Sequence, residues 1–109
     1  MKRSKFNNTK VVNSFGSFDS QKEFERFLSL REDQRLGLIK NLNRQVVYKL
    51  TDDIVGNRVK ITGEKYKADF VYEKGGNVIV EDVKGFKTAA YKRKKRIMKA
   101  VYNIDILET

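Results

Sequence analysis

Two aspartates and a lysine lie in neighbouring segments that both have the composition of β-strands. Asp69 belongs to the segment KYKADFVYE, whereas Asp82 and Lys84 lie two residues apart in VIVEDVK. Because side chains alternate between the faces of a strand, Asp82 and Lys84 share one face and Glu81 points to the other. A hairpin that turns at Gly75–Gly76 would bring Asp69 close to Asp82. The pattern therefore predicts two carboxylates and an ammonium group in one site.

Such a group of charges suits the binding of a divalent cation. Two carboxylates in a partly buried site repel each other, and one would hold a proton unless a cation compensates. The chain has no histidine and no cysteine, so oxygen atoms must hold the metal, which favours Mg²⁺ and allows Mn²⁺ as a substitute. The ion would activate water and offset phosphoryl charge. Lys84 could orient or deprotonate that water or stabilise the phosphate, and the backbone carbonyl of Val83 is a further candidate ligand.

A simpler interpretation is that Asp82 and Lys84 belong to a solvated strand face, as such pairs often do. Three features favour the functional interpretation. The strand is otherwise apolar on both faces, which is typical of a covered strand. Asp69 is surrounded by apolar residues, and Gly85 directly follows the lysine, where a ligand can approach closely.

The elements that position these residues follow from ordinary helix and strand signals. Ser20 with Glu23 has capping-box spacing at the start of a helix. We expect helices at about 21–31 and 88–102 and strands at about 45–50, 65–73, 78–84 and 103–107. Short strands could form at 10–12 and 58–61, and a short helix or turn at 32–41. The order is αβββαβ: an α/β fold with a mixed central sheet flanked by helices. We expect a basic N-terminal arm with little regular structure over 1–19 and a single domain over 20–109.

The charge of the chain indicates a polyanionic partner. There are 24 Lys and Arg residues against 14 Asp and Glu, a net charge of +10. DNA is the first candidate partner and an anionic membrane surface the second. No apolar run approaches the roughly 18 residues that span a bilayer, and the N-terminus lacks the apolar segment of a secretory signal. We therefore expect a cytoplasmic protein without a membrane partner, and the lack of cysteine fits that compartment.

The second predicted helix has an unusual excess of positive charge. Between Lys84 and Lys99 there are eight basic residues and no acidic one. Like charges three or four residues apart destabilise a helix, and a purely structural helix would normally be diluted with glutamate. We expect contact with DNA phosphates, against the alternative that the lysine stems cover apolar surface. The candidate DNA-binding residues are Lys87, Lys92, Arg93, Lys94, Lys95, Arg96 and Lys99.

The two strands also resemble the signature of a known superfamily. Tyr66-Lys-Ala-Asp69-Phe70, followed by Val80-Glu-Asp82-Val-Lys84-Gly85, is similar to the PD-(D/E)XK nuclease motif, with alanine in place of the proline. Most of the chain from about Phe15 resembles a small phage-associated family of that superfamily. The resemblance implies a restriction-endonuclease-like fold and a catalytic core of Asp69, Asp82 and Lys84.

Other members of the superfamily often carry a glutamate on the first helix in the metal site. Glu23 is the matching position, so the resemblance implies a catalytic and metal-binding role for it, although a helix cap alone would also explain it. Gln45 could lie near the site, as in related nucleases, or be an ordinary strand-end residue. Glu81 is expected either to be exposed or to support the ligands from behind.

These observations predict a Mg²⁺-dependent DNA endonuclease. The expected substrate is branched or junction DNA that arises in phage replication and recombination, and proteins of those processes are candidate partners. Cutting two strands requires two active sites, which suggests a homodimer. Two alternatives stay open: a catalytically silent DNA-binding protein with the same fold, and an accessory module for a helicase or recombinase.

Overall fold

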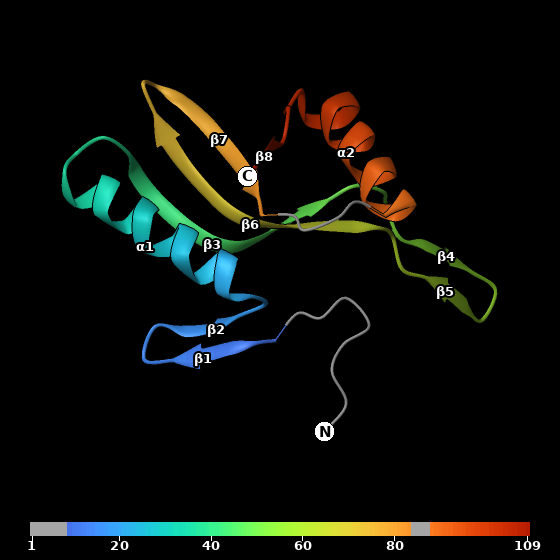
Figure 1. The fold of residues 1–109 in the computed structure, drawn as a ribbon. Coiled ribbons are helices and arrows are strands. Elements are labelled where there is room, and N and C mark those ends of the chain that lie inside the picture. The colour runs from blue at the N-terminus through green and yellow to red at the C-terminus, as the bar shows by residue number, and fades with distance from the viewer. Residues whose placement is uncertain (1–8, 84–87) are drawn as a thin grey trace.

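The computed structural model describes residues 9–83 and 88–109 (Figure 1). The described residues form two helices and eight strands in a mixed α/β arrangement. In chain order they are β1 (Val11–Asn13), β2 (Gly16–Phe18), α1 (Gln21–Arg35), β3 (Lys40–Lys49), β4 (Ile54–Gly56), β5 (Val59–Ile61), β6 (Lys65–Lys74), β7 (Asn77–Asp82), α2 (Ala89–Tyr102) and β8 (Leu107–Glu108).

The central sheet has the strand order β3-β6-β7-β8. Its first three strands are antiparallel, and β8 returns parallel to β7 after α2. This confirms the predicted mixed sheet, and α1-β3-β6-β7-α2-β8 is the predicted αβββαβ order. The turn at Gly75–Gly76 also forms as predicted, with φ of 58° and 82° at the two glycines. Glycine adopts these left-handed angles without steric cost.

Several segments differ from the sequence prediction. The strand β3 begins at Lys40 instead of about residue 45, and β8 covers Leu107–Glu108 instead of 103–107. Residues 11–18 form the hairpin of β1 and β2 instead of an irregular arm, because Phe18 packs against Phe24 and Phe27 of α1 with ring centroids 5.0 and 5.2 Å apart. The helix α1 continues four residues beyond the predicted end. Arg35 pairs with Glu32 in its last turn, and the helix ends before a glycine with positive φ.

The two helices pack against opposite faces of the sheet. Leu30 of α1 packs with Phe70 and Tyr72, whereas Met98 of α2 packs in the cluster that Val71 also contacts. Val71 and Tyr72 are neighbours on β6, and successive side chains of a strand point to opposite faces. The sheet is therefore covered by α1 on one face and by α2 on the other.

The alternation of β6 is interrupted at Asp69. Ala68 packs in the cluster beneath α2, yet Phe70, two residues on, packs in the cluster beneath α1. In the partner strand, Arg44 pairs with Phe70 and Val46 with Ala68, and Gln45 between them has a φ of 54°. A positive φ is uncommon for a residue other than glycine and is often found at functional sites. Both strands are thus distorted at the level of the predicted catalytic aspartate.

A buried ion pair fastens α1 to the sheet. The Nε and Nη2 atoms of Arg26 donate to the carboxylate of Glu81 over 2.6 and 2.9 Å. The carboxylate is completely buried and also accepts from Tyr72 and Thr109 over 2.8 and 3.0 Å. Burial by itself raises the pKa of Glu81, but the hydrogen bonds from Arg26 and Tyr72 outweigh it and lower the pKa. This network fixes the distance between α1 and β7.

We expect Arg26→Ala to destabilise the protein by about 2–3 kcal/mol. The substitution leaves a buried carboxylate without its cation, which typically costs 3–5 kcal/mol, and the partial exposure of Arg26 reduces that figure. Chemical denaturation followed by circular dichroism measures the change. Arg35→Ala, which breaks the exposed pair with Glu32 on the same helix, is the matched control and should cost less than about 0.5 kcal/mol. Equal losses in the two variants would contradict the anchoring role.

A second prediction concerns the close approach of the chain at Gly63. A Cβ atom at this position would lie 2.0 Å from the carbonyl oxygen of Thr51. We expect Gly63→Ala to cost about 2 kcal/mol or more, because backbone has to move. At Gly56 a Cβ atom would meet no atom within 4 Å, so Gly56→Ala should be neutral or slightly stabilising. Thermal melting of both variants tests this, and a stable Gly63→Ala protein would contradict it.

Candidate metal centre

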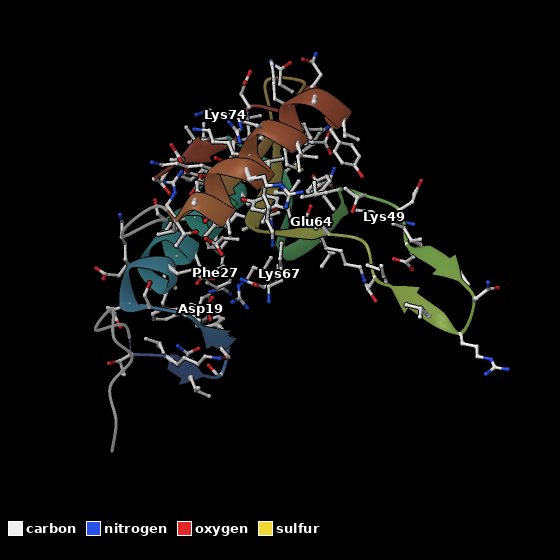
Figure 2. All side chains as sticks on the ribbon, turned by 90° about the vertical axis from the view of Figure 1, so that its right-hand side faces the viewer. Asp19, Phe27, Lys49, Glu64, Lys67 and Lys74 are labelled. Carbon is white, nitrogen blue, oxygen red and sulfur yellow. The ribbon has the colours of Figure 1, made fainter. Side chains whose placement is uncertain are left out.

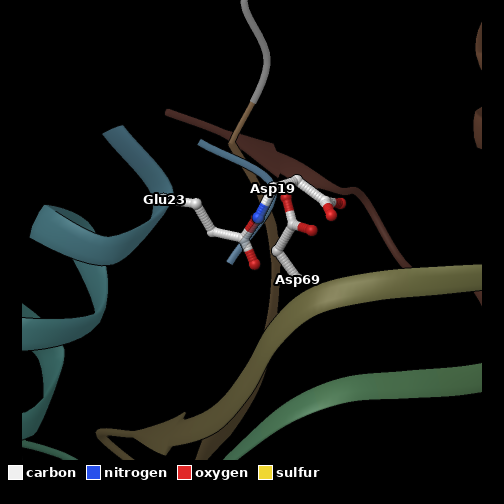
Figure 3. A group of neighbouring side chains, drawn as sticks. All are labelled: Asp19, Glu23 and Asp69. Atoms are coloured by element: carbon white, nitrogen blue, oxygen red, sulfur yellow. The ribbon is translucent and has the colours of Figure 1, made fainter. Parts of the chain in front are cut away.

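Three carboxylates from two distant parts of the chain meet where α1 begins. Asp19 precedes the helix, Glu23 lies in its first turn and Asp69 lies on β6. One carboxylate oxygen of each residue lies within 4.8 Å of the others. Figure 3 shows the three side chains converging from α1, from the loop before it and from β6. Asp19 is exposed, Asp69 is half-buried and Glu23 is 2% exposed.

A fourth carboxylate, that of Asp82 at the end of β7, lies beside Asp69 and outside this group of three. It is 1% exposed and interacts with Asp69. Burial is the largest cause of a raised pKa at Asp69, and the hydrogen bond and charge of Asp82 raise it further. Burial also raises the pKa of Glu23, and the charges of Asp19 and Asp82 add to that rise. The structure thus brings Asp69 and Asp82 together and concentrates negative charge that a cation would relieve.

Donors from three different elements hold these carboxylates in place. The hydroxyl of Tyr66 donates to Asp82 Oδ2 over 2.5 Å. The backbone N–H of Val83 donates to Asp69 Oδ2 over 2.8 Å. The side-chain amide of Gln45 donates to Glu23 over 3.0 Å, so the residue with the unusual backbone angle reaches the site. Hydrogen bonds of this kind orient the ligands of metal sites before the ion arrives.

Tyr66→Phe is expected to weaken Mn²⁺ binding by roughly 10-fold while the ring continues to fill the core. The estimate follows from the 10- to 100-fold effects of removing groups that orient metal ligands. Calorimetric titration of the wild type and the variant with Mn²⁺ measures it. Tyr48→Phe removes a hydroxyl elsewhere on the same face of the sheet and should leave the affinity unchanged. Equal affinities for Tyr66→Phe and the wild type would exclude a role for the tyrosine hydroxyl.

Glu23 combines the two roles that the sequence left open. Its backbone N–H donates to Ser20 Oγ over 3.1 Å, as a helix cap requires. Its carboxylate accepts from the backbone N–H of Asp19 over 3.0 Å, and Arg44 lies 3.8 Å away. The same carboxylate belongs to the cluster with Asp69. The cap contacts therefore hold Glu23 in the position from which it could reach a cation.

Glu81 and Asp82 are adjacent in sequence but have different surroundings. Asp82 interacts with Tyr66 and Asp69, whereas both oxygens of Glu81 are occupied by Arg26 and the other donors of the α1 anchor. Glu81 is 0% exposed, so the expectation that it could be exposed is wrong. Its ion-pair partner is Arg26 on α1, which strand alternation alone could not reveal.

Two of the predicted functional lysines, Lys84 and Lys87, lie outside the described residues. Val83 is described, and its backbone N–H supports Asp69.

A family model described as "Protein of unknown function (DUF1064)" matches residues 3–107. The chain belongs to the DUF1064 family. All four carboxylates and their donors lie within the matched region of this DUF1064 protein. No curated protein and no solved structure matches the chain. Among the described residues of the DUF1064 chain, no helix is long and apolar enough to cross a membrane.

Several basic residues of α2 in this DUF1064 protein are paired with acidic residues of other segments. Three of the seven candidate residues form ion pairs within the chain. Arg93 lies 2.5 Å from Glu64, Lys95 lies 3.1 Å from Glu108 and Lys99 lies 2.9 Å from Asp105. The candidates without an ion pair to any described residue are Lys92, Lys94 and Arg96. The acidic residues that offset the charge of this basic helix thus come from other segments of the chain.

Sequence reasoning missed Asp19 and Tyr66 as members of the DUF1064 site. Asp19 directly precedes the capping serine, a place where acidic residues are common for reasons of helix electrostatics alone. Tyr66 alternates with exposed residues on β6 and has the pattern of a core residue. On a regular strand the side chains of Tyr66 and Asp69, three residues apart, would point to opposite faces. The shared site therefore depends on the interrupted alternation of β6.

The donor set in the DUF1064 protein fits a hard divalent cation. The candidate ligands are oxygen atoms of Asp19, Glu23, Asp69 and Asp82, and Mg²⁺ and Mn²⁺ prefer such ligands. Among the described cations, Arg44 is the one that lies within 4 Å of a cluster carboxylate.

Proposed function

We propose that this protein is a Mg²⁺-dependent deoxyribonuclease, with Mn²⁺ able to replace Mg²⁺. The observation that supports it most is the position of the half-buried Asp69 beside the buried Asp82. Burial, followed by the hydrogen bond and charge of Asp82, raises the pKa of Asp69. A structural pair of this kind would lower stability without a benefit, whereas a cation site requires it. The resemblance of the same two strands to the PD-(D/E)XK motif favours DNA as the substrate.

The residues of the site would divide the work of binding and orientation. Asp69 and Asp82 would hold the cation, with Glu23 and Asp19 completing the carboxylate set. Tyr66 and the N–H of Val83 would fix the two aspartates in one orientation. A bound divalent cation lowers the pKa of water and offsets charge on the phosphate during hydrolysis. We assign Lys84 the role of orienting the water or stabilising the phosphate.

The basic residues of α2 bear on the class of DNA that we propose as the substrate. Lys92, Lys94 and Arg96 of α2 would contribute phosphate contacts, which position DNA without reading its sequence. We therefore propose branched or junction DNA of phage replication and recombination, cut in the bacterial cytoplasm by a homodimer that supplies two active sites.

Cleavage of defined substrates tests this proposal. Four-way junction, flap, nicked and linear duplex DNA are incubated with the protein in Mg²⁺, in Mn²⁺ and in EDTA. We expect metal-dependent cleavage that is faster on the junction than on the linear duplex. Salt-sensitive binding without cleavage of any substrate would favour a DNA-binding protein. Neither binding nor cleavage would favour an accessory module of a helicase or recombinase.

A further inference from the structure

A second basic surface lies on the sheet itself, on the face that α2 does not cover. Lys49 of β3 and Lys65 and Lys67 of β6 are exposed, and we call these three residues the lysine strip. Tyr66, between the two lysines of β6, is buried in the cluster beneath α2. Strand alternation therefore directs the strip away from that helix. Figure 2 shows Lys49 and Lys67 along the part of the sheet that leads toward the β4–β5 hairpin.

The strip carries charge that the rest of the chain does little to neutralise. Lys49 lies directly opposite Lys65 in the register of β3 and β6, and like charges in that position destabilise a sheet. Lys49 has Asp52 at 3.5 Å, but Lys65 and Lys67 have no ion pair with any described residue. The neighbouring Glu64 is paired with Arg93 instead.

The strip ends at the candidate metal centre. Lys67 precedes Asp69 by two residues on β6, and Lys65 precedes it by four. With a strand rise of about 3.3 Å per residue, the two lysines lie roughly 7 and 13 Å from Asp69 along the strand. One strand of duplex DNA advances about 3.4 Å per nucleotide, so the distance from Asp69 to Lys65 corresponds to roughly four nucleotides. A row of cations that starts beside the carboxylates would suit a DNA strand that has one of its phosphates at the metal centre.

We infer that the lysine strip binds the phosphodiester backbone of the DNA strand next to the phosphate that is cut. This inference rests on the proposed function for the identity of the DNA, and it names a surface that the sequence did not indicate. Phosphate contacts provide affinity and register without base recognition. The strip would place the strand along β6 with one of its phosphates at Asp69.

Salt-dependent binding in EDTA tests the strip independently of catalysis. The double variant Lys65→Gln/Lys67→Gln is compared with Lys40→Gln/Lys74→Gln, which makes the same charge change on exposed residues at the far ends of β3 and β6. Figure 2 shows Lys74 away from Lys49 and Lys67. Fluorescence anisotropy measures the affinity for labelled duplex and junction DNA between 50 and 200 mM salt.

We expect the strip variant to reduce the slope of log affinity against log salt by about 1.8, which is about 0.9 for each lost phosphate contact. Its affinity should fall at least 10-fold at low salt, and the control should change much less. An unchanged slope, or the same change in both variants, would overturn the inference. Binding of the wild type to anionic phosphatidylserine vesicles but not to DNA would also overturn it.

The outcomes separate this inference from the nuclease proposal. If no substrate is cut but the slope falls only in the strip variant, the nuclease proposal fails and the strip remains a DNA contact. If cleavage occurs and the slope is unchanged in the strip variant, the DNA-binding role of the strip is wrong and the nuclease proposal stands. After the cut is mapped, neutral methylphosphonate linkages placed singly around it provide a second measurement. Wild-type binding should weaken when the neutral linkage lies within about four nucleotides of the cut on one side. The strip variant has already lost these contacts, so the same linkages should not weaken its binding further.

Discussion

Asp82→Asn is expected to reduce metal-dependent DNA cleavage by roughly 10³-fold. The variant retains the shape of the side chain and an oxygen that can accept from Tyr66, but it removes the negative charge that holds the cation. Loss of about 4 kcal/mol of transition-state stabilisation, a typical contribution of a bound metal, corresponds to that factor. Single-turnover cleavage of junction DNA over a range of Mg²⁺ concentrations measures it.

The matched control for this experiment is Glu32→Gln, which removes the same charge from a side chain that is 51% exposed in the last turns of α1, away from the carboxylates at the start of that helix. It should retain nearly full activity. Melting temperatures of both proteins show whether a loss of activity follows from unfolding. A folded Asp82→Asn protein that cuts DNA at the wild-type rate would mean that the metal centre is assigned wrongly.

Asp69→Asn is expected to stabilise the protein in the absence of metal. Burial, followed by the hydrogen bond and charge of Asp82, raises the pKa of Asp69 to about 8. The folded state therefore binds a proton more tightly than the unfolded state. That contribution to stability is complete below the unfolded pKa near 4 and is lost as pH rises through 8. In EDTA the wild type should become less stable from about pH 5 to pH 8, and asparagine should remove much of that loss.

We expect the melting temperature of Asp69→Asn at pH 8 in EDTA to exceed that of the wild type by roughly 4–8 °C, the effect of about 1 kcal/mol in a domain of this size. Addition of Mg²⁺ or Mn²⁺ should stabilise the wild type, because a ligand of the folded state raises its stability, and should have little effect on the variant. Glu32→Gln again serves as the control. A variant that melts below the wild type at pH 8 would show that Asp69 is held by structural contacts and not strained by its neighbours.

Together the two substitutions separate stability from activity. Neutralising a structural carboxylate lowers the stability of the protein. Neutralising a carboxylate that serves to bind a cation raises the stability of the protein but removes its function. The Arg26–Glu81 pair gives the contrasting case in the same molecule, since its removal should cost stability. Opposite signs of the stability change at Asp69 and Arg26 would show which carboxylates belong to the fold and which to the site.

The sequence by itself determined the features that depend on local periodicity. Period-two alternation selected Asp82 over Glu81 on the strand that became β7. The glycine pair marked the β6–β7 turn, and Ser20 and Thr88 marked the starts of the two helices. These signals are readable because a few neighbouring residues decide each of them.

Tertiary structure alone decided how distant segments meet. The distortion at Gln45 and Asp69 changes which face of the sheet the following side chains of β3 and β6 point to, and no local sequence pattern predicts it. It brings Asp69 to the start of α1, where Asp19 and Glu23 lie. The ion pairs of α2 and the exposure of the lysine strip likewise depend on which elements pack together. The sequence thus named Asp69 and Asp82, and the packing of α1 and α2 on opposite faces of a distorted sheet decided which other groups surround them.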